Sequence, residues 1–362
     1  MEAGGNPERR RAGAGGARHG AATERPGGWQ RPDTDATIRC ASLASLEDRP
    51  TMYRPARIID SHIHLVTSGT HQVKLRRLSG LNPRLVEAYR RRWHDSLASR
   101  REETPEAEPA PVQIVAKRWE TALDAAGVER GVFFTSPDYH DDLLTFISLN
   151  PERFVGYTTF DPTDRANADL LRRQVDAHGV RGLKLYPMAL GFHVDDEACD
   201  EVYEVCEARR IPVIIHFGIS INATHDLRFG NPLDLSGPAL RHPSVSWIIP
   251  HFGAGFFREA LMVAVQHRNV YIDTSSSNNW VASDPHGLTV ADLFKRTIDA
   301  VGTERLLFGT DSSFFPRGYR ANILDDHLAI CDRLGLSPEQ IDGVFGGNIR
   351  RILDGHVPAR PQ

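Results

Sequence analysis

The chain has 362 residues, a net charge of −4 and 25% charged residues, a composition typical of globular proteins. This charge balance excludes a strongly basic nucleic-acid-binding protein. No apolar run reaches the length of about eighteen residues that a membrane-spanning helix needs. The four cysteines form no CxxC pair, and their scatter predicts reduced thiols in a cytoplasmic protein rather than a disulfide framework.

The two ends of the chain differ in composition from the part between them. Residues 1–50 are rich in Gly, Arg, Ala and Pro and have no hydrophobic period. Such a segment buries too little apolar surface to offset its ordering entropy, so we predict a disordered tail there. The stretch "VPARPQ", 357–362, is expected to be a loose C-terminal tail, and residues 51–356 to form one domain.

From residue 57 onward, short β-rich runs alternate with helix-length amphipathic segments. Near-continuous apolar runs are typical of parallel strands that are buried on both faces. The eight runs cover residues 57–65, 130–137, 153–162, 181–187, 211–218, 245–253, 269–277 and 305–313.

The intervening segments carry the residues that begin and end helices. One segment ends at Gly179, and another ends before Pro212. The last has Ser337 as N-cap, Pro338 in the first helical position and Gln340 at the third. Eight strands that alternate with helices predict a (β/α)8 TIM barrel, a fold that forms one domain of roughly 250 residues. An open doubly wound sheet is the second choice, because no GxGxxG follows the first strand.

The connection between the first two expected strands is unusually long. It contains a basic helical stretch, 71–93, and then a Pro/Glu-rich stretch, 101–112. We expect an insertion over 66–118 on the catalytic face of the barrel, because it follows the carboxyl end of a strand. A substrate lid, a dimerisation arm and a solvated decoration all remain open, and a homodimer is expected only from the general frequency of dimers.

The first strand, "RIIDSHIHLV", places three titratable side chains in a buried run. Residues two apart in a strand project to the same side, which predicts that Asp60, His62 and His64 share one face. Two imidazoles at this spacing can share one metal ion. By itself, an HxH pair is a weak signal.

Four further polar residues interrupt apolar runs at equivalent positions. His216, His251 and Asp311 stand at the ends of the fifth, sixth and eighth runs, and Lys184 lies in the fourth. A buried polar group is costly unless it is paired or bound to a metal. In a barrel, the carboxyl end of a strand is the place of catalytic residues. Together with the HxH pair, these residues predict a metal site.

This set of motifs resembles the amidohydrolase superfamily of metal-dependent barrels, and in particular its amidohydrolase-2 branch. That branch includes hydrolases, lactonases and decarboxylases related to aminocarboxymuconate-semialdehyde decarboxylase. The resemblance covers about residues 57–355 and is specific for the superfamily rather than for a substrate. It depends on "DSHIHL", "NPERFVGYTTFDP", "GLKLYP", "VIIHFG", "PHFGAG", "LLFGTDSSF" and "VFGGNIRRIL".

The resemblance implies a role for each matching residue. His62 and His64 match metal ligands of the first strand, and His216 matches the ligand of the fifth. Asp311 matches the aspartate that binds metal and orients or deprotonates the attacking water. His251 matches a histidine that polarises the substrate or shuttles protons in members with one metal. In members with two metals, His251 binds the second ion.

The number and the identity of the metals follow from the same residues. Neutral imidazoles and one carboxylate suit Zn²⁺, while Mn²⁺, Fe²⁺ and Co²⁺ are not excluded. One metal is favoured, because the branch commonly has one. The resemblance also implies a second ion, bound with His251 and bridged by Lys184, if that lysine is carboxylated.

Two enzymatic reactions and one non-enzymatic role remain open. We expect metal-dependent hydrolysis of a small amide, lactone or ester, with non-oxidative decarboxylation of an aromatic or unsaturated acid as the alternative. Lys184 favours hydrolysis, because the related decarboxylases often lack it. The HxH pair in place of ExH disfavours the benzoate-type decarboxylases. An inactive barrel used for binding is least consistent with the intact set of ligands.

Other residues are weaker candidates. Asp60 is expected to form either a hydrogen bond to a ligand histidine or an ion pair at the bottom of the barrel. The remaining candidates for substrate contact follow expected strands or lie in the insertion: Tyr186, Phe192, His193, Asn278, Asn279, Trp280, Arg317, Arg76, Arg77 and Arg91.

Overall fold

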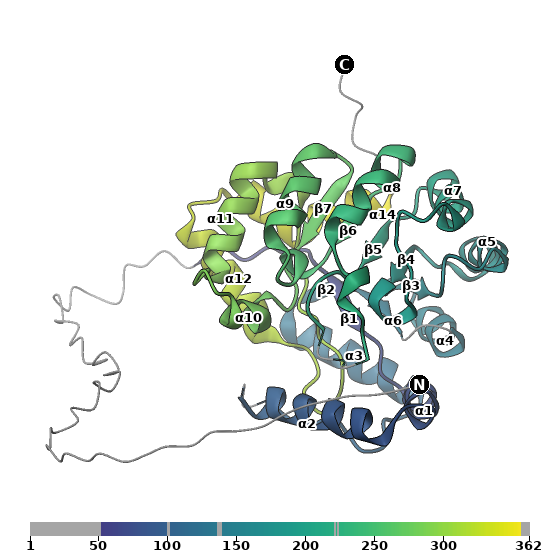
Figure 1. Cartoon of the computed structure of the whole chain (residues 1–362). Helices are drawn as coiled ribbons and strands as arrows, with labels where there is room; N and C mark the ends of the chain where they lie inside the picture. Colours follow the sequence, from purple (N-terminus) through teal and green to yellow (C-terminus); the bar gives the residue numbers. More distant parts are fainter. Residues whose placement is uncertain (1–51, 100–101, 136–139, 221, 223, 356–362) are drawn as a thin grey trace, which may run out of the picture. The chain divides into compact units, whose positions relative to one another are not determined.

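The computed structural model describes residues 52–355, except 100–101, 136–139, 221 and 223. The expected tails at 1–50 and 357–362 lie outside the described residues. Eight strands form one parallel sheet in which each strand pairs with the next in chain order (Figure 1). They are β1 (Ile58–His64), β2 (Val128–Phe134), β3 (Phe154–Thr159), β4 (Gly182–Leu185), β5 (Val213–Ile215), β6 (Trp247–Ile249), β7 (Val270–Asp273) and β8 (Leu306–Leu307).

The segment that continues β8 pairs with β1 and closes the sheet into a barrel. The Asp311 N–H donates to the His62 carbonyl at 3.0 Å, and the His64 N–H donates to the Ser312 carbonyl at 2.8 Å. A parallel bridge joins Ile63 to Ser312. The predicted (β/α)8 barrel is therefore confirmed.

Helices surround the sheet, as Figure 1 shows. No helix in the described ranges is long and apolar enough to cross a membrane. The helices that follow the insertion are α3 (Val112–Ala126), α4 (Asp141–Leu149), α5 (Ala166–His178), α6 (Pro187–Leu190), α7 (Asp200–Arg209), α8 (Ser236–Arg241), α9 (Phe257–Gln266), α10 (Ser277–Trp280), α11 (Val290–Val301), α12 (Ala321–Arg333), α13 (Pro338–Asp342) and α14 (Asn348–Leu353).

The expected helix ends are present in the structure. α5 ends at Gly179, which has a φ of 72° that glycine adopts at little cost. α7 ends before Pro212. At α13 the Ser337 hydroxyl accepts from the Gln340 N–H at 3.3 Å, and the Gln340 side chain accepts from the Ser337 N–H at 2.9 Å. This reciprocal pair is the predicted capping box.

Strand residues alternate between two apolar layers. Ile214 of β5 lies in one cluster, while Val213 and Ile215 lie in a second cluster with helix residues such as Trp119. The first cluster therefore fills the barrel and the second packs the helices on it. The filling also contains Ile349 of α14, so this helix covers one end of the barrel.

β1 is irregular at its centre, and this irregularity corrects one prediction. Asp60 pairs with Gly131 and Ile63 pairs with Phe133, so three steps on β1 face two steps on β2. Such a bulge shifts the alternation of side chains. It places Asp60 on the side of Ile63, so the prediction that Asp60 shares a face with the two histidines was wrong. The Asp60 carboxylate accepts from the His62 N–H at 2.9 Å within the bulge.

The connection after β1 contains two helices, α1 (Ser68–Ser79) and α2 (Pro83–Ser99). In Figure 1 they lie at the end of the barrel where α6 and α10 follow β4 and β7. That end carries the carboxyl ends of the strands. Because α3 already begins at Val112, the expected insertion, 66–118, extends into the first helix of the barrel.

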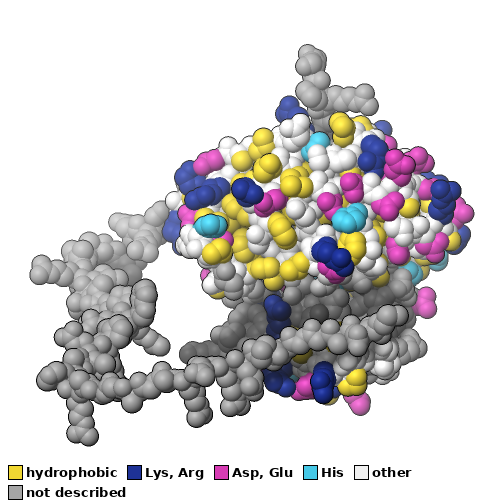
Figure 2. Space-filling view, in the orientation of Figure 1, with side chains coloured by type: hydrophobic (Ala, Val, Ile, Leu, Met, Phe, Trp, Pro, Cys, Tyr) yellow, Lys and Arg dark blue, Asp and Glu magenta, His cyan; other side chains and the backbone are white. Residues whose placement is uncertain are grey.

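Exposed apolar side chains occur on α8 and α9, on the face shown in Figure 2. Leu240 is 73% exposed, Val265 57% and Met262 54%. Scattered residues of this kind are ordinary on globular proteins. These three exposed side chains are therefore no evidence of a binding partner at this face.

His327 of α12 makes stability depend on pH. Its ring is fully buried, with Nδ1 3.3 Å from the Thr274 hydroxyl. Burial lowers the pKa of His327 to about 3, below the ordinary value of 6.5. The unfolded chain therefore binds the proton first as the pH falls, and stability is lost between about pH 6.5 and pH 3.

We expect the His327→Gln variant to lose less of its unfolding free energy between pH 7 and pH 4 than the wild type. Glutamine keeps a hydrogen-bonding group but takes up no proton. Urea denaturation with a chelator present measures this slope, and the exposed His286→Gln is the control. Equal slopes in the wild type and the His327→Gln variant would contradict the account.

Candidate metal centre

Five of the predicted residues lie where strands end. His62 and His64 are at the end of β1, and His216 directly follows β5. His251 follows β6 by two residues, and Asp311 lies in the segment after β8. The carboxyl ends of parallel strands share one end of a barrel, so the fold brings these side chains together.

The distances show how closely they converge. The Asp311 Oδ1 atom lies 3.0 Å from His64 Nε2 and 3.6 Å from His62 Nε2. His251 Nε2 lies 3.2 Å from His216 Nδ1. Three of the five residues, His62, His251 and Asp311, have ligand atoms that all lie within 4.8 Å of one another. His64 and His216 join this group through Asp311 and His251.

Two of the five residues have an unusual backbone. His251 has a φ of 59° and Asp311 a φ of 58°, in the left-handed region that non-glycine residues rarely adopt. Hydrogen bonds hold both positions: the His62 carbonyl accepts from Asp311, and the His251 carbonyl accepts from Trp280 Nε1 at 2.8 Å. Strain of this kind concentrates at functional sites.

A second constraint fixes the distance between the histidines that follow β5 and β6. Gly218, two residues after His216, has a φ of 79°. A Cβ atom at this position would lie 2.2 Å from the Ala254 carbonyl oxygen and 2.4 Å from the Gly253 carbonyl oxygen. Only a residue without a side chain lets the two loops approach this closely.

Asp273, at the end of β7, was missed in the sequence analysis. Its Oδ2 atom lies 2.7 Å from His62 Nδ1, and both side chains are fully buried. Because a carboxylate accepts, Nδ1 donates, and the lone pair of His62 stays on Nε2, toward Asp311. The available signal was an acid at the end of the apolar run "VYID", as at the other strand ends.

The protonation states of this pair follow from burial and charge. Burial lowers the pKa of His62 to about 3, so its ring is neutral at pH 7. Burial also tends to raise the pKa of Asp273, but the hydrogen bonds that it accepts from His62 and Ser275 oppose this, and the pKa is lowered to about 2. The pair is therefore a carboxylate and a neutral imidazole.

His251 and His216 have a matching arrangement. The Ser275 carbonyl oxygen, 2.9 Å from His251 Nδ1, can only accept, so Nδ1 carries the proton. In the neutral ring, Nε2 then accepts from His216 Nδ1. This leaves the lone pair of His216 on its own Nε2. Burial lowers the pKa of both histidines, which favours these neutral forms.

The residues fit a divalent cation. Within this group of side chains, three buried nitrogen atoms have no hydrogen-bond partner among the described residues: His62 Nε2, His216 Nε2 and Lys184 Nζ. Buried polar atoms without partners are rare and costly, and a bound metal satisfies such atoms. Neutral imidazole nitrogens and a carboxylate are the ligands that Zn²⁺, Mn²⁺ and Fe²⁺ accept.

Lys184 of β4 is fully buried beside this group. Its Nζ atom lies 4.9 Å from the centre of the Phe134 ring and 5.0 Å from that of Tyr186. Burial lowers the pKa of Lys184 to about 7, although the charges of Asp273 and Asp311 oppose this. A large fraction of this amine is therefore uncharged at neutral pH.

Asp60 supports the site from behind. Its Oδ2 atom accepts from the Thr310 hydroxyl at 2.6 Å, and its Oδ1 atom accepts from the Thr310 N–H at 3.2 Å. Burial raises the pKa of Asp60 to about 7, against these hydrogen bonds. Asp60 therefore holds the residue before Asp311, and it bonds to the backbone of His62 rather than to its ring.

The weaker candidates divide into several groups. Tyr186 lies beside His216, with ring centres 6.1 Å apart, and Trp280 holds the His251 carbonyl. Arg317 pairs with Glu102. The other described ones lie elsewhere or in local contacts: Phe192 in the core, Asn279 on Ser276, Arg91 on Glu87, and His193 with Asp195 and Asp234 in an exposed group. The side chains of Arg76, Arg77 and Asn278 lie outside the described residues.

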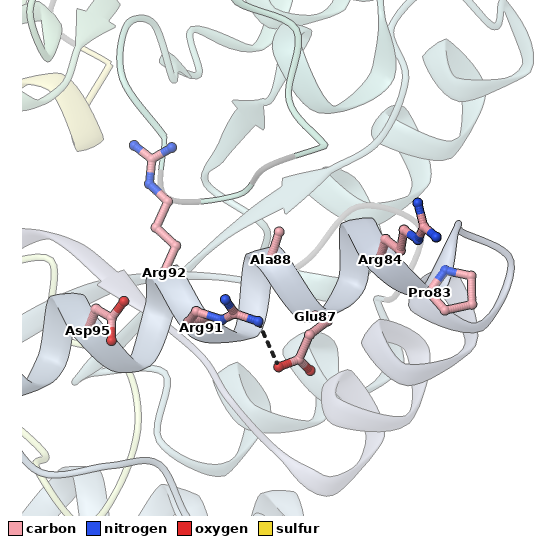
Figure 3. A pocket seen from close by; sticks show the side chains of 7 residues that line it. All are labelled: Pro83, Arg84, Glu87, Ala88, Arg91, Arg92 and Asp95. Atoms are coloured by element: carbon pink, nitrogen blue, oxygen red, sulfur yellow. Dashed lines mark ion pairs between the residues drawn. The ribbon is translucent and has the colours of Figure 1, made fainter.

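A hollow of about 610 Å³ lies along α2, away from the five side chains at the strand ends. Figure 3 shows that its described lining comes from this one helix. An exposed ion pair, with 3.7 Å between Arg91 Nη2 and Glu87 Oε1, runs along it. A single helix face offers no enclosed binding site, so this hollow adds nothing to the candidate centre.

A family model described as amidohydrolase matches residues 59–355. The chain belongs to the amidohydrolase family. The match begins within β1 and ends after α14, so it spans the whole barrel, and the predicted membership is confirmed. Protein fluG of Emericella nidulans is 28% identical over 108 residues, which are 30% of this chain and 12% of that protein. This amidohydrolase chain thus spans a small part of that relative.

Three solved structures illustrate the shared fold. A 5-carboxyvanillate decarboxylase from Sphingomonas paucimobilis is 17% identical, with 83% of this chain and 99% of that chain covered and a TM-score of 0.58. An uncharacterised barrel protein from Bordetella bronchiseptica is 20% identical, with the same coverage and TM-score. A probable 2-pyrone-4,6-dicarboxylic acid hydrolase from Acinetobacter baumannii is 15% identical, with 82% and 99% covered and a TM-score of 0.54.

We expect Gly218→Ala to destabilise the protein more than Gly127→Ala. Both glycines have positive φ, at 79° and 66°, so both variants carry backbone strain. Only at Gly218 does the added Cβ meet carbonyl oxygens; at Gly127 nothing lies within 4 Å. Gly127→Ala should cost about 1 kcal/mol in unfolding free energy. Urea denaturation measures both, and equal losses would contradict the close approach of the two loops.

Proposed function

We propose that the chain is a metal-dependent hydrolase that acts on a small amide, lactone or ester. The observation that carries this proposal is the environment of the Asp311 carboxylate. Its side chain is 24% exposed and touches His64 and His62 while His251 stands within reach. A partly exposed carboxylate among imidazole side chains is what the activation of water needs.

Several side chains would hold one divalent cation. We propose His62, His64, His216 and Asp311 as its ligands, with zinc as the expected ion. When bound there, the cation supplies a Lewis acid that lowers the pKa of a coordinated water and polarises a carbonyl. A structural neighbour from Novosphingobium aromaticivorans binds manganese, so the chemistry of this fold is not restricted to zinc.

Asp311 is suited to take the proton of the attacking water. Burial tends to raise the pKa of Asp311, but the hydrogen bond that it accepts from His64 opposes this, and the pKa lies well below its ordinary value. The carboxylate is therefore ionised at neutral pH and can accept a proton. It can then transfer this proton to the leaving group as the substrate bond breaks.

His251 is suited to act on the oxygen of the substrate. Its Nδ1 is committed to the Ser275 carbonyl, so any second proton is held at Nε2. The charges of Asp311 and Asp273 favour the protonated ring, while burial disfavours it more strongly. In the neutral ring Nε2 is an acceptor, so His251 can take up a proton there during the reaction, once the hydrogen bond from His216 Nδ1 is released. It can then donate this proton toward an oxygen on which negative charge develops.

Lys184 distinguishes two versions of the centre. An uncharged amine beside the ligands is compatible with one cation, which we favour. Carboxylation of Lys184 would instead provide a bridge to a second ion, with His251 as its ligand. Mass determination of the intact native protein distinguishes the two, because carboxylation adds CO₂ to the chain.

Decarboxylation is the alternative reaction on the same residues. The neighbours include both a 5-carboxyvanillate decarboxylase and a probable 2-pyrone-4,6-dicarboxylic acid hydrolase. A proton at His251 Nε2 would serve a decarboxylase as well, because the carbon that loses CO₂ must be protonated. We favour hydrolysis because Asp311 is an ionised base and because Lys184 is present.

Metal-replete protein assayed on a mixed panel of lactones, esters, amides and aromatic acids tests the proposal. We expect hydrolysis of at least one lactone, ester or amide and no release of CO₂. Asp311→Asn should lower the rate about 10²–10⁴-fold, the usual contribution of a general base. Release of CO₂ without any hydrolysis would replace the proposal by the alternative.

The removal of Asp273 should weaken metal binding although Asp273 is not itself a proposed ligand. In the Asp273→Asn variant, the amide no longer fixes the proton on His62 Nδ1, so we expect about 10–100-fold lower affinity. Competition with a chelator measures the dissociation constant. Asp176→Asn, which removes an exposed pair with Arg209, is the control and should bind like the wild type. Unchanged affinity in Asp273→Asn would refute this role.

A further inference from the structure

The insertion is joined to the loop after β8 by a nearly buried group of charges. Glu102, just beyond α2, lies between two arginines of that loop, with Oε2 2.5 Å from Arg317 Nη1 and Oε1 3.2 Å from Arg320 Nη2. Only 14% of the Glu102 side chain, 14% of Arg317 and 5% of Arg320 are exposed. Charges this buried need a counter-charge.

Arg320 carries this contact to both neighbours of Asp311. Its Nη1 atom donates to the Thr310 carbonyl at 3.2 Å, and its backbone N–H donates to the Ser312 hydroxyl at 2.9 Å. The Thr310 and Ser312 hydroxyls are themselves 2.6 Å apart. The residues before and after Asp311 are thus held by the same arginine that Glu102 holds.

Two further contacts bring the insertion against this loop. The Trp93 ring of α2 lies 6.2 Å from the Phe314 ring, measured between ring centres. Within the loop, the Arg317 guanidinium lies 4.2 Å from the centre of the same Phe314 ring. The Glu106 N–H donates to the Phe315 carbonyl at 3.0 Å. The insertion therefore touches the loop through an aromatic pair, a backbone bond and the Glu102 charge.

We infer that Glu102 is a positioning residue for Asp311. The insertion thereby contributes to the geometry of the candidate metal centre. The inference rests on the proposed function only in giving Asp311 its role. Without the carboxylate at position 102, the two nearly buried guanidinium groups lose the negative charge that Glu102 places between them. Arg320 then shifts toward solvent and releases the Thr310 carbonyl.

The backbone of Asp311 makes this position sensitive. A left-handed φ of 58° persists only where its surroundings hold it. The Asp60 carboxylate of β1 holds the Thr310 hydroxyl, and Arg320 holds the Thr310 carbonyl. Loss of the hydrogen bond from Arg320 leaves the Asp311 carboxylate free to turn away from His64 and His62.

Glu102→Gln and Glu106→Gln form a matched pair of variants. Glu106 lies on the same segment, but its carboxylate pairs with Arg118 of α3 at 2.9 Å rather than with an arginine of the loop after β8. We expect Glu102→Gln to bind metal about tenfold more weakly than the wild type. Glu106→Gln should keep wild-type affinity. In a substrate assay, Glu102→Gln should lower kcat more than it raises KM.

Hydrogen exchange gives a readout that needs neither metal nor substrate. Amides 310–320 should exchange faster in Glu102→Gln than in Glu106→Gln. Glu102→Asp keeps the charge on a shorter side chain, and it should recover part of both the affinity and the protection. This variant also decides the matter if Glu102→Gln does not fold.

The outcomes separate this inference from the proposed function. Faster exchange at 310–320 with unchanged metal affinity would mean that Glu102 only anchors the insertion, and the inference would be wrong. Unchanged exchange would also overturn it. If the wild type binds no metal, the proposed function fails, and exchange at Thr310–Ser312 alone decides whether Glu102 positions Asp311.

Discussion

The backbone pairing between β1 and the segment after β8 is the constraint on which the rest of the site depends. The Asp311 N–H donates to the His62 carbonyl, and the His64 N–H donates to the Ser312 carbonyl. These bonds close the barrel, and they also bring a carboxylate from one end of the chain against two imidazoles from the other. The same hydrogen bonds therefore close the barrel and assemble the site, and a change that breaks this pairing of β1 with the segment after β8 should affect both.

Around this pairing, His62 and His251 are each oriented by a hydrogen bond from Nδ1. Asp273 accepts a hydrogen bond from His62 Nδ1, and the Ser275 carbonyl accepts one from His251 Nδ1. Burial keeps the rings neutral, so lone pairs rather than protons point to the centre. The residues that tolerate strain and close approach, such as Gly218, serve the same end, because they fix the distances between loops. The orientation of the proposed metal ligands thus depends on residues that are not themselves ligands.

The sequence predicts most of the candidate metal-site residues because polar residues interrupt apolar runs at the ends of strands. His216, His251 and Asp311 are recognisable in this way, and Asp273 at the end of "VYID" carries the same signal, although it was missed. Asp60 was misplaced because a bulge, which hydrophobic alternation does not reveal, shifts the side chains of β1. The contact of Glu102 with Arg317 and Arg320 joins segments more than two hundred residues apart, and no local pattern marks it.

The central claim is that these strand ends form one metal centre. Anomalous X-ray diffraction from crystals grown with Zn²⁺ or Mn²⁺, recorded on both sides of the absorption edge of the metal, tests it most directly. The account predicts a peak ligated by His62, His64, His216 and Asp311, with Asp273 hydrogen-bonded to His62 behind it. A barrel with no peak, or a peak confined to the exposed group of His193, Asp195 and Asp234, would contradict it.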